Sequence, residues 1–328
     1  MKPTRPQLQA NSAGAVALEA IDPPGKLFAR RTLQRRTSLI QLSFTAPAIV
    51  FMAAMFGYPL YYNLSMSFTD FRVGSFLTGV APFVGFRNYT DLFADSLFVG
   101  SLTKTAIFTA FSIAGQMGIG LSLALFFWRP FPASKTLRAL LLAPWLLPLV
   151  VSATVWRWIY EQDSGVLNYV LVQSGLIADK VPWLTSPPHA LAAVIITNIW
   201  IGIPFSAAVF YSGLQALPRE LFEAAEIDGA RAFQRFWHIT LPLLKPLTAI
   251  VFMLSVTYTV KVFDLIFVLT GGGPAYATQT LAIYAYELSF RHLDFGHGAA
   301  AGNILILISL VFAVFYLRSF RKSMTEYA

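Results

Sequence analysis

The chain contains no cysteine, and only 12% of its 328 residues are charged. The absence of cysteine excludes disulfides, thiolate nucleophiles and cysteine-ligated metal sites. A soluble domain carries roughly a quarter charged residues, so the low charge indicates that lipid rather than water surrounds most of this protein. Hydrophobic residues make up 56% of the sequence, which agrees with that interpretation.

Acidic residues are scarcer than basic ones, which leaves a net charge of +8. In a soluble protein such an excess can indicate nucleic-acid binding, but in a membrane protein the positions of the charges matter more than their sum. No G-x-x-x-x-G-K-[ST] phosphate loop occurs, and the four histidines show no spacing typical of a metal site. We therefore expect no nucleic-acid partner, no catalytic residue, and no cofactor or metal bound by this chain.

Long apolar runs dominate what is present. A transmembrane helix needs about 20 mostly apolar residues, and six segments meet that requirement, at residues 39–62, 100–128, 139–160, 189–213, 246–270 and 299–320. The predicted fold is all-α, a polytopic membrane protein with six transmembrane helices within residues 39–320. Several spans contain Pro or Gly, which membrane helices tolerate because neighbouring helices re-satisfy the freed backbone groups.

Lys and Arg are distributed asymmetrically between the two sides of the membrane. With the N-terminus inside, the cytoplasmic segments hold 17 of them and the outer segments hold 4. This bias predicts that both termini are cytoplasmic. Residues 1–38 are then expected to be a mobile basic tail, which either touches anionic lipid headgroups or serves only to set the topology. Residues 321–328 form a second, short cytoplasmic tail.

The segment RELFEAAEIDGARAFQRFWHITLPLLKP, residues 219–246, interrupts the apolar pattern with eight charged residues. Its first part predicts an amphipathic helix with Leu221, Phe222 and Ala225 on one side. Gly229 either breaks this helix or lets another backbone approach closely, and a second short helix follows. The segment is too charged to cross the bilayer, so we expect it at the cytoplasmic surface, on lipid headgroups or in a partner.

The same loop, residues 214–245, resembles the EAA loop of ABC-importer membrane subunits. The resemblance rests on the spacing of seven residues: Glu223, Ala224, Ala225, Gly229, Ile239, Leu241 and Pro242. It implies a type I ABC importer permease fold, in which the loop is a coupling helix seated in a groove of a cytoplasmic ATPase. From periodicity alone, an ordinary amphipathic helix at the membrane interface is the alternative.

Two further stretches, VLTGGGPAYATQTLAIYAYELSF and DFGHGAAAGNILI, are similar to the end of carbohydrate-importer permeases of the maltose and glycerol-phosphate type. This resemblance implies a non-catalytic permease subunit of the bacterial inner membrane, for a sugar or sugar-related solute. The implied partners are a homologous second permease, an ABC ATPase dimer that binds ATP and Mg²⁺, an extracytoplasmic solute-binding protein and membrane lipid. The solute stays open among oligosaccharides, monosaccharides, polyols and glycerol phosphate.

Polar side chains inside spans are costly unless they face a cavity or one another, and two spans carry a polar stripe. The resemblance aligns NIWIGIPF and SVTYT with sugar-lining stretches of the maltose permease. It thereby implies six solute-binding residues: Asn198, Gly202, Phe205, Ser255, Tyr258 and Thr259. Packing between helices, where Ser, Thr and Gly are common, is the alternative for each stripe. Lys261 and Asp264, three residues apart, are expected to form an ion pair, structural or functional.

Two other kinds of membrane protein compete with a permease. An integral-membrane phosphotransferase would need an Ala-Arg pair at fixed spacing after Asp228-Gly229 and two further spaced aspartates, which do not follow here. A secondary transporter would need inverted repeats and buried coupling acids, but Asp264 is the only acid well inside a predicted span. Both alternatives are therefore disfavoured.

Overall fold

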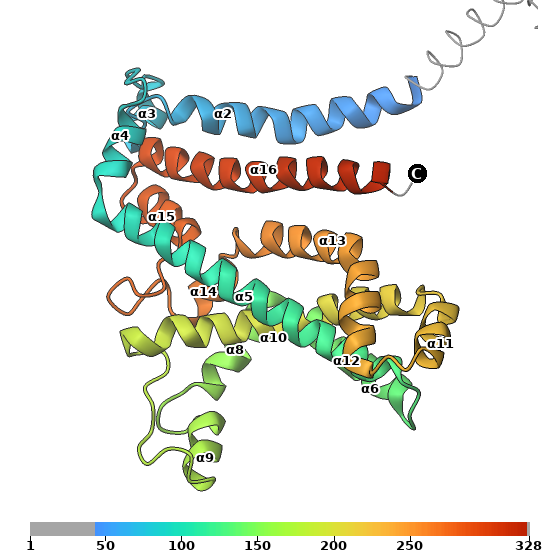
Figure 1. The fold of residues 1–328 in the computed structure, drawn as a ribbon. Helices are drawn as coiled ribbons and strands as arrows, with labels where there is room; N and C mark the ends of the chain where they lie inside the picture. Colours follow the sequence, from blue (N-terminus) through green and yellow to red (C-terminus); the bar gives the residue numbers. More distant parts are fainter. Residues whose placement is uncertain (1–42, 327–328) are drawn as a thin grey trace, which may run out of the picture. The chain divides into compact units, whose positions relative to one another are not determined.

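The computed structural model describes residues 43–326, which are mostly helical (Figure 1). Within these residues there is no β-strand, and the only bridges are two isolated ones, Thr69 with Phe83 and Arg72 with Asp294. The predicted all-α class is therefore confirmed. The predicted N-terminal tail, residues 1–38, lies outside the described residues, and its role stays a prediction.

The chain divides into two compact units, residues 1–60 and 61–328. The first predicted span corresponds to the helix Ser43–Met66, which begins in the first unit and ends in the second. This helix passes through a π-helical turn, η1 (Ala53–Gly57), into α2 (Tyr58–Met66). None of its most apolar stretch is buried. A helix that is apolar on its whole surface requires lipid or another protein around it.

The second unit is built on two long helices, α5 (Ser96–Trp128) and α10 (Pro187–Gln215), which pack along each other. Their backbones approach closely at glycines, as is common between membrane helices. A Cβ added to Gly120 would lie 2.6 Å from the Cβ of Ser206. The remaining elements are α3 (Val73–Thr78), α4 (Arg87–Ala94), α6 (Ser134–Leu141), α7 (Ala143–Leu146), α8 (Leu149–Ile159), α9 (Val166–Gln173), α11 (Arg219–Ile227), α12 (Ala232–Arg235), η2 (Phe236–Thr240), α13 (Leu241–Thr259), α14 (Asp264–Leu269), α15 (Leu281–Tyr286), η3 (Glu287–Arg291) and α16 (Phe295–Glu326).

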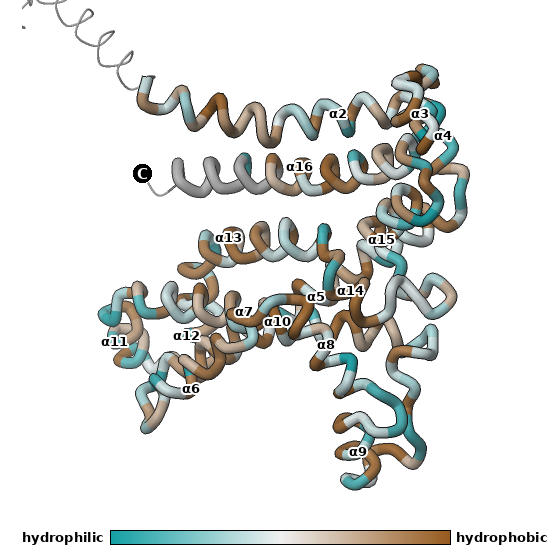
Figure 2. The backbone as a smooth tube through the Cα atoms, turned by 180° about the vertical axis from the view of Figure 1, so that it is seen from behind, coloured by the Kyte–Doolittle hydropathy of each residue, from teal (hydrophilic) through white to brown (hydrophobic). Residues whose placement is uncertain are grey.

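Five described helices are long and apolar enough to cross a membrane, and a sixth span results if one bent pair is counted as one. The second and fourth predicted spans agree with the observed helices within four residues. The first agrees within four residues at its end, and its predicted start lies outside the described residues. α16 begins four residues before the predicted sixth span, and its helical backbone continues to Glu326. Figure 2 shows hydrophilic positions in α11 and in the loops next to α9, outside the long apolar helices.

The third predicted span, residues 139–160, is not one straight helix. The segments Ser134–Leu146 and Leu149–Ile159 meet at an angle of 99°. Leu147, at the break, has an extended backbone with ψ of 142°. Pro148 follows it, and a proline disfavours the helical conformation of the residue before it. The bend is therefore encoded by a proline that the hydropathy pattern passes over.

The bounds predicted for the fifth span, residues 246–270, are wrong at both ends. The helix is continuous from Ala232 to Thr259, through α12, η2 and α13. The chain then turns, and α14 begins as a separate helix at Asp264. The short helix expected after Gly229 is thus the beginning of the fifth span rather than a separate element.

The π-helical turn η2 lies directly before the first of the two prolines in this helix. The N–H of Leu241 donates to the carbonyl of Phe236, one residue farther back than in an α-helix. Pro242 follows immediately and has no N–H to donate. Pro246 lies inside α13. A π-turn widens the helix locally, and here it occurs at the proline-containing entry to the span.

Candidate functional site

α11 ends in a Schellman motif, in which a left-handed residue reverses the chain and two N–H groups satisfy the last carbonyls. Gly229 is that residue, with φ of 77°. The N–H of Ala230 donates to the Ala225 carbonyl at 2.8 Å, and the N–H of Gly229 donates to the Glu226 carbonyl at 3.1 Å. A Cβ added to Gly229 would have no described atom within 4 Å. Of the two roles predicted for Gly229, the structure supports the helix break and not close backbone packing within this chain.

α11 contacts α5 on one side and α12 on the other. The rings of Phe222 and Trp128, the last residue of α5, meet edge to face with centroids 5.2 Å apart. Arg235 of α12 lies 3.2 Å from a carboxylate oxygen of Glu226. The Glu226 side chain is 71% exposed, so this ion pair contributes little stability by itself. α11 thus contacts α5 through a ring pair and α12 through an exposed ion pair.

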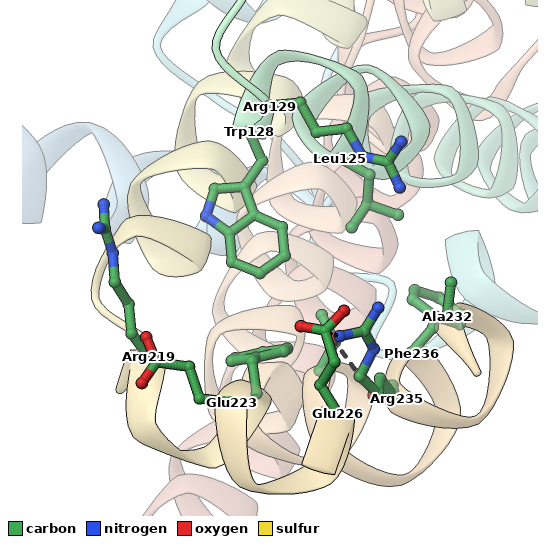
Figure 3. A pocket seen from close by; sticks show the side chains of 11 residues that line it. Leu125, Trp128, Arg129, Arg219, Glu223, Glu226, Ala232, Arg235 and Phe236 are labelled. Carbon is green, nitrogen blue, oxygen red and sulfur yellow. Dashed lines mark hydrogen bonds and ion pairs between the residues drawn. The ribbon is translucent and has the colours of Figure 1, made fainter. Parts of the chain in front are cut away.

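A cavity of about 500 Å³ lies between α11, the end of α5 and the helix α12–η2–α13 (Figure 3). Figure 3 shows Trp128 projecting toward the helix that carries Glu223 and Glu226, with the Glu226–Arg235 ion pair across from it. Of the seven predicted coupling residues, Glu223 lines this cavity, and Ile239 and Leu241 are the chain neighbours of Thr240, which also lines it. The lining residues are Leu125, Trp128, Arg129, Arg219, Phe222, Glu223, Glu226, Ala232, Arg235, Phe236 and Thr240.

Several side chains of the loop remain exposed. Glu223 and Ala224 are exposed, while Ala225 is half-buried. Ile227 is 87% exposed and Phe233 is 74% exposed. Large apolar side chains exposed beside charged ones are typical of a protein–protein interaction surface. Of the motif's second half, Ile239 and Leu241 are half-buried and Pro242 is exposed.

Helix packing occupies much of the predicted solute stripe on α10. The Gln116 amide of α5 donates to the Asn198 carbonyl at 3.0 Å, and a Cβ added to Gly202 would lie 2.2 Å from Cδ of Gln116. Phe205 is half-buried, with its ring 6.0 Å from that of Trp145. The buried side-chain nitrogen of Asn198 has no hydrogen-bond partner among the described residues. Gly202 thus serves packing, and Asn198 keeps an unpaired donor.

The predicted stripe on α13 is divided by burial. Ser255 and Thr259 are buried, whereas Tyr258 is 63% exposed. The Lys261 ammonium lies 5.5 Å from the centre of the Tyr258 ring, within reach of a cation–π interaction. The predicted Lys261–Asp264 ion pair is absent from the ion pairs within residues 43–326. It does not form because α13 ends at Thr259, so the helical spacing that would join the two residues is lost.

None of the six predicted solute residues lines the cavity beside α11 or the two other cavities described below. Their role in binding solute stays a prediction. Gln116 was not identified from the sequence. An amide side chain in the middle of an apolar run could have marked it as a residue that contacts another helix. Its contact with α10 could not be read from the sequence, because the two residues that meet are 82 positions apart.

Asn168 holds together the connection between α8 and α10, and it was not singled out either. Its side-chain nitrogen donates to the carbonyls of Gln162 at 3.0 Å and Val181 at 2.9 Å. Its side-chain oxygen accepts from the N–H of Val181 at 3.2 Å and from the indole N–H of Trp183 at 2.9 Å. A buried amide with both ends satisfied makes this connection a defined structure rather than a loose loop.

A polar cavity of about 550 Å³ lies at the base of that connection. Arg157, Glu161 and Trp183 line it, together with Thr270 and Gly271 from the glycine-rich turn after α14. Hydrogen bonds from the backbone N–H and hydroxyl of Ser164 hold the pKa of Glu161 below its ordinary value. The glycine-rich turn thus shares a polar cavity with the α8–α10 connection.

His297, to which no chemistry was assigned from the sequence, joins two carboxylates at the start of α16. Its Nδ1 lies 3.0 Å from Asp294, and its Nε2 lies 3.6 Å from Asp91 of α4. Burial alone would raise the pKa of Asp294, but the hydrogen bonds from His297 outweigh it and hold that pKa below its ordinary value. No group of three or more His, Asp or Glu residues within residues 43–326 is arranged to hold a metal ion.

Comparison with known proteins shows related sequences over most of the chain. Residues 116–323 match the family described as the binding-protein-dependent transport system inner membrane component. The chain is 35% identical over 291 residues to the sulfoquinovosyl glycerol transport system permease protein SmoG of Agrobacterium fabrum, covering 89% of this chain and 93% of that protein. It is 38% identical over 237 residues to the trehalose/maltose transport system permease protein MalF of Thermococcus litoralis, covering 72% and 79%.

Solved structures show the same fold. One is the crystal structure of a bacterial ABC transporter involved in the import of the acidic polysaccharide alginate, with a TM-score of 0.76, 22% identity, and coverage of 89% of this chain and 99% of that one. Another contains the alginate transporter with an alginate pentasaccharide-bound periplasmic protein, with a TM-score of 0.74 at 22% identity, and coverage of 88% and 96%. The predicted type I importer permease fold is confirmed. The chain belongs to the family of binding-protein-dependent transport system inner membrane components, and is therefore a multi-pass transport subunit.

Proposed function

We propose that this chain forms half of the membrane pathway of an ATP-driven importer for a sugar or sugar-related solute. The support for the solute class comes from relatives named for sulfoquinovosyl glycerol and for trehalose and maltose. The support for ATP as the energy source comes from the family and from the coupling motif, which runs from α11 into the beginning of the fifth-span helix. A homologous second permease completes the pathway, and an extracytoplasmic binding protein delivers the solute.

The observation that carries this proposal is the construction of α11. It is a short helix with a Schellman end, attached by Phe222 to the end of α5 and by Glu226 to the beginning of the fifth-span helix. Its exposed residues include Glu223 and Ala224 of the motif. A small alanine allows close approach of a partner surface, while the glutamate offers an ion pair at the rim. We infer that α11 docks on an ABC ATPase.

The continuity of Ala232–Thr259 suggests how movement reaches the pathway. A displacement of α11 would act on α12 through Arg235 and then along one unbroken helix to Ser255 and Tyr258. ATP binding would close the ATPase pair and draw the two coupling helices together, which would open the pathway outward, and hydrolysis would reset it inward. ATP and Mg²⁺ are bound by the ATPase in this proposal. Coupling of this kind requires a two-state element that both sites bias, and the α11–α13 assembly is our candidate.

The solute would meet the pathway on the accessible part of the two predicted stripes. Phe205 and Tyr258 offer aromatic faces, whereas the unpaired amide nitrogen of Asn198 is buried and would donate to a solute hydroxyl only after helix movement. Ser255 and Thr259 are buried, so their hydroxyls would serve only after helix movement. The excess of Lys and Arg in the predicted cytoplasmic segments supports placing both termini and α11 on the cytoplasmic side of the membrane. The membrane in this proposal is the bacterial inner membrane.

Disulfide cross-linking tests the docking proposal cleanly because the chain has no cysteine. Ala224→Cys should form a disulfide with a cysteine introduced in the surface groove of the ATPase. Ala178→Cys is a matched control, since Ala178 is equally exposed but lies on the α8–α10 connection, on the outer side in our topology. Equal cross-linking at both positions, or none at Ala224 in an active transporter, would contradict the proposal.

A further inference from the structure

A groove lies between α5, α6 and α10. Figures 1 and 2 show α6 near the end of the second unit that carries α11. It has a volume of about 340 Å³ and an almost wholly apolar floor. We refer to it as the α6 groove. Its lining residues are Ala124, Phe127, Lys135, Arg138, Ala139, Leu141, Leu142, Pro204, Ala207, Ala208 and Tyr211.

The local sequence explains why the groove is open. α10 presents Pro204, Ala207 and Ala208 to it, and these short side chains leave space that a leucine would fill. α5 contributes the equally small Ala124. The helices on both sides belong to the membrane-spanning part of the chain, so the floor of the groove lies where lipid chains are the ordinary solvent.

Two cations stand at the groove, and they have no carboxylate to neutralise them. Lys135 is exposed at the first turn of α6, and Arg138 is half-buried one turn later. The Arg138 guanidinium lies 4.3 Å from the centre of the Tyr211 ring, and its Nε donates to the Ser134 carbonyl at 3.3 Å. Neither cation belongs to an ion pair within residues 43–326, and no acidic residue lines the groove. Tyr211 therefore holds Arg138 in place without cancelling its charge.

We propose that the α6 groove binds one anionic phospholipid, with the phosphate between Lys135 and Arg138 and an acyl chain along Ala207 and Ala208. Charge complementarity selects the headgroup, because two cations without a carboxylate attract an anion and repel the ammonium of a zwitterionic lipid. The apolar floor selects a lipid over a free anion, since a free phosphate gains nothing from that surface. Lys and Arg at a span's beginning also lie at headgroup depth.

Lipid retention measured by native mass spectrometry tests this site. The full chain is purified in detergent with its copurifying subunits, stripped of loosely bound lipid, and supplied with dioleoyl phosphatidylglycerol or dioleoyl phosphatidylcholine. We expect preferential retention of phosphatidylglycerol. Lys135→Gln and Arg138→Gln should each weaken it roughly fivefold, the effect of one basic residue near an anionic lipid. Arg138→Lys keeps the charge and should retain the preference.

Two further variants separate the acyl-chain site from the charges. Ala208→Trp fills the groove and should reduce retention of both lipids. Lys245→Gln is the matched control, because Lys245 is an exposed lysine near the beginning of α13 that does not line the groove, and it should change nothing. The proposal would be overturned if the two lipids were retained equally. It would also be overturned if combining Lys135→Gln with Arg138→Gln left retention unchanged, or if excess inorganic phosphate displaced the lipid. Absence of retained lipid in the assembled transporter would overturn it also, because the groove would then be covered by another subunit.

Discussion

Substitution of Gly229 tests whether α11 must end where it does for the importer to work. Gly229 has φ of 77°, a left-handed conformation that costs an ordinary L-residue about 1–2 kcal/mol and glycine almost nothing. Since a Cβ there would have no described atom within 4 Å, the cost is conformational and not a clash within the chain. A cost of 1–2 kcal/mol lowers the population of the native helix end by a factor of about 5–30.

The size of the effect should follow the tolerance of each side chain for the left-handed conformation. Asn visits this region more readily than other residues, and β-branched residues avoid it. We therefore expect transport to fall in the order Gly229, Gly229→Asn, Gly229→Ala, Gly229→Val. The assay is uptake of the solute by cells that contain equal amounts of each variant in the membrane, together with the amount of ATPase that copurifies. Both readouts should fall in the same order.

Gly175 provides a matched control for this series. It closes α9 with the same pair of hydrogen bonds, from Gly175 to the Val172 carbonyl and from Leu176 to the Leu171 carbonyl, with φ of 70° and no described atom within 4 Å of an added Cβ. Gly175→Val should leave the copurifying ATPase unchanged, since α9 is not part of the proposed docking surface. Normal uptake with Gly229→Val would refute the reasoning. If Gly229→Asn and Gly229→Val were equally damaging, contact with the ATPase, and not φ, would be the reason for the glycine.

Three other outcomes follow from the described contacts. Gly202→Ala should displace Gln116 and lower the stability by about 1–3 kcal/mol through overpacking. The detergent-solubilised protein should then aggregate at a lower temperature. Adding Gln116→Ala to the same chain should recover part of the lost stability, and no recovery would contradict the contact. Asn168→Ala should leave several buried hydrogen-bonding groups unpaired, which lowers the stability by about 1–3 kcal/mol. The α8–α10 connection should then become sensitive to limited proteolysis. Unchanged resistance to the protease would show that other contacts hold the connection together. Tyr258→Ala and Asn198→Ala should raise the solute concentration for half-maximal uptake without changing complex yield, and unchanged kinetics in both would remove the solute assignment.

Local patterns predicted the parts of this protein whose structure depends on near neighbours. The spans at residues 100–128 and 189–213 were placed within four residues, because about 20 apolar residues suffice for a membrane helix. A helix break at Gly229 was one of two alternatives predicted from the sequence, and it could be predicted because a Schellman motif involves only the last turn and the two residues after it. Whether a proline bends a helix could not be predicted in the same way. Pro148 breaks a helix and Pro246 does not, although both lie within the predicted apolar spans, at residues 139–160 and 246–270.

The tertiary structure alone decided which faces of these helices are used. Hydropathy and spacing showed that the chain spans a membrane and carries a charged loop between two spans, because both are properties of consecutive residues. They did not show that Gln116 fills the space beside Gly202, or that Lys261 turns to Tyr258 and not to Asp264. Nor did they bring Lys135 and Arg138 to an apolar groove with α10. Each depends on contact between helices or on where a helix ends, and burial, not composition, then determines whether a polar side chain packs, pairs or remains available for a ligand.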